Sequence, residues 1–229
     1  MTVVLAGLAV AAGAVAQAVT GLGFSLVSAP LLIALEGPRD GVRLNLVLSA
    51  IINVVLLAPQ RRSVRRRDTL RLLVPAAIAT PLTAWATGGA DTDVLLVAAG
   101  VLTIASAIAL LAGGRTWRRS SATVAGAISG VMNTVAGIGG PVVALHALNE
   151  DWPAVERKAT FQLYFLLLNA AGILALGPRW PSPVLLAALA AGWLAGRRVA
   201  PLVSERTARA ATLAVAAAGG AVALARGLV

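Results

Sequence analysis

The sequence predicts an all-α polytopic membrane protein that forms a single transmembrane domain over residues 1–229. Hydrophobic residues make up 59% of the chain and charged residues only 12%, with a mean hydropathy of +0.87. One soluble core of this size cannot bury so much apolar surface. Apolar runs close to the roughly 20 residues needed to cross hydrocarbon recur along the whole chain. No polar stretch between them is long enough to form a separate soluble domain.

Ten apolar segments are separated by turn signals such as Gly37-Pro38, Gly88-Gly89 and Gly177-Pro178. The segments cover residues 2–19, 22–35, 42–58, 70–87, 93–112, 122–136, 138–148, 160–177, 183–200 and 207–226. Two of them, 22–35 and 138–148, are short and extend only about 16–21 Å at 1.5 Å per residue. We therefore expect these two to be half-helices buried within the bundle, away from lipid.

The basic residues indicate the orientation of the chain in the membrane. If the N-terminus is outside and all ten segments cross, fifteen of the nineteen basic residues fall in cytoplasmic connections, as the positive-inside rule requires. These connections are residues 59–71, 113–121, 149–159 and 197–209. With the two short segments returning to the same face, the arginines of 197–209 would lie on the opposite side, so ten crossings are favoured. The same clustering between apolar runs argues against nucleic-acid binding.

The composition provides few residues of the types that catalysis needs. The chain has one histidine and no cysteine, and no Asp or Glu lies deep in a predicted span, so we expect no enzyme, no metal site and no cofactor. The high Ala, Arg and Gly content favours a bacterial source and hence the cytoplasmic (inner) membrane. The lipid bilayer is the expected surrounding partner, and a homo-oligomer is compatible with the sequence.

Two blocks of similar sequence lie 116 positions apart. The first is Gln17-Ala-Val-Thr-Gly-Leu-Gly-Phe24 and the second is Asn133-Thr-Val-Ala-Gly-Ile-Gly-Gly140. Asn53 and Asn169 have the same separation. A lone Gly-x-Gly is usually explained by close helix packing, but two copies in register, each followed by a matched Asn, favour a function.

The blocks predict two repeats, residues 1–114 and 115–229. With five membrane segments each, an odd number, the second repeat would enter the membrane upside down. Inverted repeats with broken helices near the membrane midplane are an architecture of secondary transporters.

The glycine motifs resemble those of the TauE/SafE family of sulfite exporters. The resemblance is carried by Gly13-x7-Gly-Leu-Gly-Phe with Pro30, by Gly126-x3-Gly130-x6-Gly-Ile-Gly-Gly-Pro141, and by the stretch from Pro153 to Asn169. It implies transport of sulfite, thiosulfate, an organosulfonate or a related small anion, by movement of one repeat against the other. The alternatives are a transporter of another small anion or metabolite, and a membrane assembly protein that transports nothing.

A small anion at the membrane midplane needs hydrogen-bond donors, because hydrocarbon offers none. Glycines let backbone N–H groups approach a ligand without a Cβ in the way, and helices that begin after them would direct their N-terminal ends at the anion. Side-chain amides and hydroxyls would supply further donors. The expected substrate-binding residues are Gln17, Thr20, Gly21, Gly23, Ser25, Asn53, Asn133, Thr134, Gly137, Gly139, Gly140 and Asn169. The alternative for each amide is a hydrogen bond that ties two helices together.

Two further groups have both a functional and a structural interpretation. His146, the only histidine, could carry a proton or a counter-charge, or could be a neutral packing residue. Arg39, Arg43, Arg157 and Lys158 flank the helices that end at the matched asparagines. They could attract anions to the two mouths of the protein, or anchor the helices at the membrane interface.

Overall fold

The computed structural model describes residues 1–113 and 121–229, apart from the side chain of Glu205. This part of the chain contains no strand and has ten α-helices with two short 3₁₀ helices. In chain order these are α1 (Thr2–Thr20), α2 (Phe24–Glu36), α3 (Pro38–Leu57), η1 (Ala58–Ser63), α4 (Arg66–Ala86), α5 (Thr92–Ala112), α6 (Ala122–Ala136), α7 (Gly140–Asn149), α8 (Ala154–Leu176), α9 (Pro183–Val199), η2 (Ala200–Leu202) and α10 (Glu205–Gly227). Each predicted apolar segment falls on one helix, which confirms the all-α class. The predicted boundary between repeats, and most of the basic 113–121 connection, lie outside the described residues.

Helices α3 and α8 begin earlier than predicted, at Pro38 instead of 42 and at Ala154 instead of 160. Each starts beside a proline, and each has an acidic residue in its first turn, Asp40 in α3 and Glu156 in α8. Proline is favoured at a helix start and acidic residues stabilise the first turn. A search for apolar runs passes over such polar first turns.

Seven helices of the described chain are long and apolar enough to cross a membrane: α1, α3 with η1, α4, α5, α8, α9 with η2, and α10. The chain is therefore a multi-pass membrane protein. Helices α2, α6 and α7 have 13, 15 and 10 residues. The short lengths of α2 and α7 agree with the prediction, whereas α6 is also short, about 22 Å at 1.5 Å per residue.

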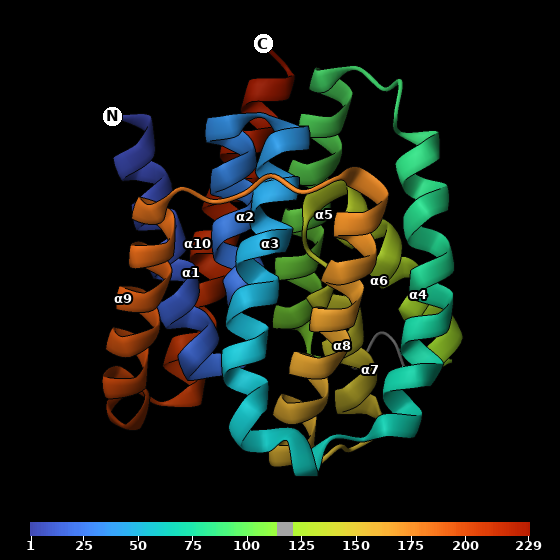
Figure 1. Cartoon of the computed structure of the whole chain (residues 1–229), viewed down its shortest axis with the longest axis vertical. Helices are drawn as coiled ribbons and strands as arrows, with labels where there is room; N and C mark the ends of the chain where they lie inside the picture. Colours follow the sequence, from blue (N-terminus) through green and yellow to red (C-terminus); the bar gives the residue numbers. More distant parts are fainter. Residues whose placement is uncertain (114–120) are drawn as a thin grey trace.

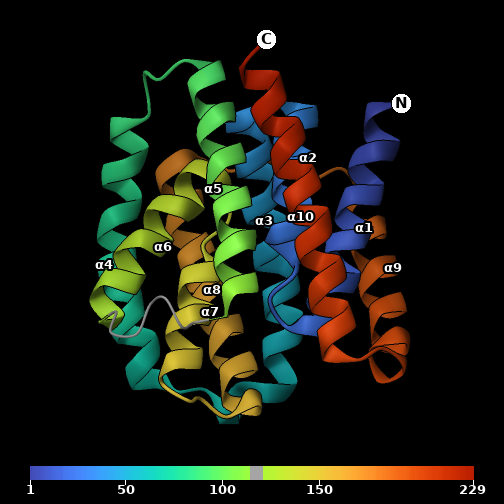
Figure 2. The same cartoon turned by 180° about the vertical axis from the view of Figure 1, so that it is seen from behind.

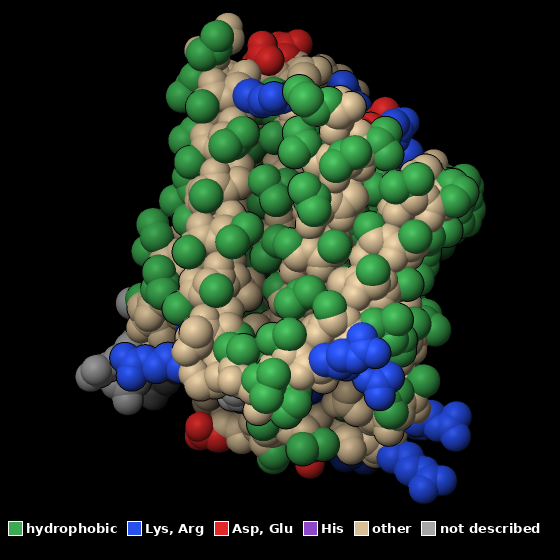
Figure 3. All heavy atoms as spheres, turned by 90° about the vertical axis from the view of Figure 1, so that its left-hand side faces the viewer, with side chains coloured by type: hydrophobic (Ala, Val, Ile, Leu, Met, Phe, Trp, Pro, Cys, Tyr) green, Lys and Arg blue, Asp and Glu red, His purple; other side chains and the backbone are tan. Residues whose placement is uncertain are grey.

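Large apolar side chains cover the outer surface of the bundle. Leu8 is 62% exposed, Ile108 61% and Leu174 87%, which suits contact with lipid tails. Figure 3 shows the face over α1 and α9, where hydrophobic side chains spread over the middle and Lys and Arg side chains gather toward the lower end. An apolar belt with a basic edge is typical of a membrane protein at its cytoplasmic face.

The path of the chain places two helix hairpins opposite each other (Figures 1 and 2). Both termini lie at one end of the molecule, and α1 runs inward from that end before α2 returns to it. Helix α6 runs inward from the other end, which we call the basic end, and α7 returns there. The turns at Gly21–Gly23 and Gly137–Gly139 are buried within the bundle.

Glycines allow the closest helix contacts. Helix α4 packs along α6, α1 along α9, and α5 along α10. A Cβ on Gly126 in α6 would overlap the carbonyl oxygen of Leu72 in α4, and one on Gly192 in α9 would overlap that of Ala11 in α1. Backbones approach this closely only where no side chain intervenes, which is the usual mode of helix association in membranes.

Ion pairs tie the helix ends together outside the apolar belt. Arg179 contacts Glu36 at 2.9 Å and Asp40 at 3.1 Å near the termini. At the basic end, Arg65 pairs with Asp68 at 2.6 Å and with Glu156 at 2.7 Å, joining α4 to α8. Hydrogen bonds to these two carboxylates raise the pKa of the Arg65 guanidinium above its usual value.

Candidate functional site

A small polar cavity lies between the two buried turns. Its volume is about 20 Å³, close to the space that one water molecule needs. It is lined by Gln17, Leu22, Ser25, Leu26, Ser49, Asn53, Asn133, Ile138, Gly139, Gly140, Phe165 and Asn169. Seven of the twelve predicted binding residues are among them: Gln17, Ser25, Asn53, Asn133, Gly139, Gly140 and Asn169. We call this space the polar cavity.

The residues that share the 116-position separation form matching hydrogen bonds. Gln17 Nε2 donates to Asn53 Oδ1 at 3.4 Å, and Asn133 Nδ2 donates to Asn169 Oδ1 at 3.3 Å. The hydroxyl of Ser49 accepts from Asn169 at 2.9 Å and from Asn53 at 3.5 Å. Helices α1, α3, α6 and α8 thus bring four neutral amides into one network, in which all four side chains are nearly fully buried.

The two helices that begin at the turns have different N-termini. Gln17 Oε1 accepts the backbone N–H of Phe24 at 2.9 Å and so caps α2. No side chain caps α7, whose N-cap Gly139 and first residue Gly140 line the polar cavity. Pro141 occupies the first turn of α7, where its missing N–H is not needed for a helical hydrogen bond. An uncapped helix N-terminus carries partial positive charge and favours an anion.

A reciprocal pair of hydrogen bonds holds the turns. Asn45 in α3 donates to the carbonyl of Gly137 at 3.2 Å, and Gln162 in α8 donates to the carbonyl of Gly21 at 3.0 Å. Gln162 Oε1 also accepts from Gln17 at 3.1 Å. Each long helix therefore anchors the turn that belongs to the other half of the chain.

The predicted binding residues do not include Asn45, Gln162 or Ser49. Each is a polar residue inside an apolar run, which is itself a signal of function or pairing in a membrane. Asn45 and Gln162 are 117 positions apart, one more than the repeat offset, so a search for matched residues passes over them. In the structure, each of these two residues donates to the carbonyl of the first glycine of a buried turn, Gly137 or Gly21.

Five predicted residues do not line the cavity. Thr20 donates to the carbonyl of Ala16 at 2.8 Å and Thr134 to that of Gly130 at 2.8 Å, each one helical turn back. The other three belong to the turns: Gly21, Gly23 and Gly137. Gly21 and Gly137 have left-handed φ angles of 78° and 67°, which glycine adopts without strain.

His146 lies outside the polar cavity. It is 6% exposed and packs edge-to-face on Trp152, with ring centroids 6.0 Å apart. Its position six residues beyond Gly140 places it about 9 Å further along α7, toward the basic end. A direct contact between this imidazole and a ligand in the cavity is not supported by the geometry.

Loss of one anchor weakens the fold measurably. Asn45→Ala removes the side-chain donor to the Gly137 carbonyl and leaves Ser28 and Ser25 without their shared partner. We expect the free energy of unfolding to fall by about 1 kcal/mol, the range of hydrogen bonds between membrane helices. Reversible unfolding in mixed micelles would measure the change. Gln60→Ala, which removes one bond to the Leu56 carbonyl at a helix end, is the control. Equal stability of the two variants would contradict the anchoring role.

The fold and the site together define a class: a multi-pass membrane protein whose broken helices enclose a polar centre, as in transporters. A family model described as sulfite exporter TauE/SafE matches residues 5–223 of the chain. The protein belongs to this family, which consists of membrane transporters and not of enzymes. The resemblance predicted from the glycine motifs is thereby confirmed. No curated protein and no solved structure matches the chain.

Proposed function

We propose that this protein is a secondary transporter that moves a small sulfur-containing anion, such as sulfite, thiosulfate or an organosulfonate, across the bacterial cytoplasmic membrane. The polar cavity is its substrate site. The observation that carries the proposal is the meeting of the two matched pairs, Gln17–Asn53 and Asn133–Asn169, in one buried space. Membership in the TauE/SafE family supports the choice of anion.

The chemistry of the cavity suits a small oxyanion. Its side chains present amide and hydroxyl donors, and the uncapped start of α7 adds partial positive charge. None of the lining residues carries a formal charge. Neutral donors bind an anion less tightly than a buried arginine would, and transport requires release as well as binding.

Helix packing supports alternating access by two inverted repeats, residues 1–114 and 115–229. If each helix is replaced by the helix five places further along the chain, counting on from α10 to α1, the α1–α9 contact becomes the α6–α4 contact. The same replacement exchanges the two partners within the α3–α8 contact and within the α5–α10 contact. Two structurally equivalent halves with opposite orientation can exchange their conformations and so open the site to each face in turn. At about 20 Å³ the cavity holds about one water, so movement of one repeat against the other must also widen it.

Flux in proteoliposomes tests this function. We expect the protein to move at least one of sulfite, thiosulfate and a simple organosulfonate faster than empty liposomes do. Asn53→Ala/Asn169→Ala should lower that flux about tenfold, because it removes two amides that would bind the substrate; a factor of ten corresponds to about 1.4 kcal/mol of binding or barrier. Gln60→Ala should transport normally.

Two results would contradict the proposal in different ways. Flux of acetate, nitrate or phosphate without any sulfur anion would place the substrate in another class. No flux and no ligand-induced thermal shift across the whole panel would leave a membrane protein with an assembly role.

A further inference from the structure

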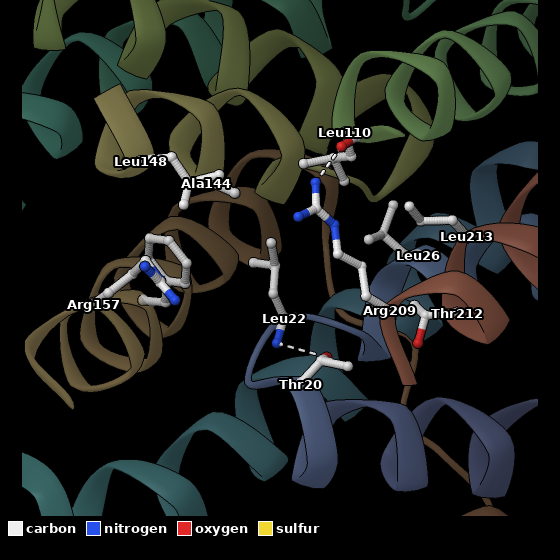
Figure 4. Close-up of a pocket in the computed structure, with 11 residues that line it drawn as sticks. Thr20, Leu22, Leu26, Leu110, Ala144, Leu148, Arg157, Arg209, Thr212 and Leu213 are labelled. Carbon is white, nitrogen blue, oxygen red and sulfur yellow. Dashed lines mark hydrogen bonds between the residues drawn. The ribbon is translucent and has the colours of Figure 1, made fainter. Parts of the chain in front are cut away.

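A second hollow lies between the polar cavity and the basic end. It has a volume of about 150 Å³ and is formed by the α1–α2 turn with the adjoining ends of α5, α7, α8 and α10 (Figure 4). Seven of its eleven described lining residues are apolar, five of them leucines, and the charged ones among the described residues are Arg157 and Arg209. We call this hollow the vestibule.

In the part of the chain that the structure describes, both arginines of the vestibule hydrogen-bond backbone carbonyls. Arg157 donates to the carbonyl of Trp152 at 3.5 Å, and Arg209 donates to the carbonyl of Leu110. Neither forms an ion pair with a carboxylate of the described residues, in contrast to Arg65 at the same end. Charges of one sign in a walled hollow attract counter-ions and raise their local concentration.

Of the described residues, Leu22 and Leu26 line both the vestibule and the polar cavity. Leu22 belongs to the α1–α2 turn, where its N–H donates to Thr20 Oγ1 at 3.2 Å. Its Cδ1 lies 2.9 Å from where a Cβ on Gly140 would be, so its side chain lies directly over the start of α7. Figure 4 shows Leu22 between Arg157 and Arg209. An apolar side chain at the junction blocks a hydrated anion.

We propose that the vestibule collects small anions for the polar cavity, that Arg157 and Arg209 attract them, and that Leu22 is the gate between the two spaces. This inference rests on the proposed function and adds the route by which the substrate reaches the site from the basic end. Because Leu22 belongs to one hairpin and Gly140 to the other, a small displacement of the α1–α2 turn from α7 opens the junction. The same displacement widens the polar cavity, since both residues line it.

Cysteine accessibility tests the charge of the vestibule without any need for transport. The natural chain contains no cysteine, so Ala144→Cys places a single thiol in the vestibule wall. Oriented membrane vesicles would be treated from the basic end with a sulfonate-bearing thiol reagent and with a trimethylammonium-bearing one. We expect Arg157→Gln/Arg209→Gln to slow the anionic reagent about tenfold, the lower end of electrostatic steering effects, and not to slow the cationic one. Equal changes for both reagents would overturn the attraction of anions.

The gate is tested with a thiol inside the polar cavity. In Ser49→Cys, labelling by the anionic reagent should be slow, and adding Leu22→Ala should speed it about tenfold by removing the apolar barrier. Leu22→Phe should slow the labelling further. If one of the two variants does not fold, the labelling rate of the other still tests the gate. Leu213→Ala, which shortens a leucine that lines only the vestibule, should leave the rate unchanged. A rate that is the same for alanine, leucine and phenylalanine at position 22 would overturn the gate.

The two proposals fail independently. Labelling rates that respond to position 22 and to the arginines, together with no flux of any sulfur anion, would keep the gated vestibule and reject the proposed substrate. Flux of a sulfur anion, together with labelling rates that do not depend on these residues, would support the proposed transport function and reject the route through the vestibule.

Discussion

Gln17→Glu nearly abolishes transport of the sulfur anion, with an expected loss of about 100-fold. Glutamate matches glutamine in size and still accepts the N–H of Phe24, but it no longer donates to Asn53 and Gln162. It also places a negative charge in the space that the anion must enter. A charge within the membrane costs about 2.5–3.5 kcal/mol by insertion scales, which corresponds to roughly a 100-fold change.

The pH dependence of flux in Gln17→Glu distinguishes the effect of the negative charge from the effect of the altered hydrogen bonds. A protonated glutamic acid is neutral and can donate one hydrogen bond, so we expect the flux of Gln17→Glu to recover partly as the pH falls. Stopped-flow measurement of flux into proteoliposomes at several pH values would show this, with each rate divided by that of the unmodified protein at the same pH. Gln60→Glu, at the basic end, is the matched control and should behave like the unmodified protein. A flux for Gln17→Glu within twofold of normal at neutral pH would refute the role of Gln17.

Gly126→Ala destabilises the fold by about 3 kcal/mol, the upper part of the range for overpacking a tight interior. The new methyl group would overlap the carbonyl oxygen of Leu72 and come within 2.8 Å of Pro75 Cγ. Two backbones cannot separate locally without opening the whole α4–α6 contact, so the cost is not relieved by a rotamer change. A lower thermal unfolding midpoint in detergent would measure the effect.

The rest of the chain provides controls for this substitution. Gly192→Ala produces the same overlap in the α1–α9 contact, and we expect a similar loss of stability. Gly89→Ala, where no atom lies within 4 Å of the new methyl group, should leave the midpoint unchanged. If Gly126→Ala and Gly89→Ala unfold at the same temperature, the close approach of α4 and α6 does not exist in solution.

Much of the candidate site could be predicted from the repeat offset alone. The repeat offset predicts Gln17, Asn53, Asn133 and Asn169 as site residues because they recur at equal spacing, and the structure brings all four into one network. Equal spacing identifies equivalent positions, but it does not say which way a side chain points. Thr20 and Thr134 satisfied the pattern of small polar residues near the glycines and nevertheless bond to their own helices, as threonine hydroxyls readily do.

The sequence by itself determined the ten α-helices of the described residues, their boundaries within about six residues, the family and the positions of the two buried turns. It could do so because a chain in lipid must satisfy its backbone within each helix, so hydropathy and glycine placement are local signals. Only the tertiary structure decided the rest: that Asn45 and Gln162 hold the turns of opposite halves, that Ser49 joins the two amide pairs, and that Leu22 covers Gly140. These roles depend on contacts between residues about 90 to 140 positions apart, and no local pattern in the chain encodes which apolar side chain meets which turn.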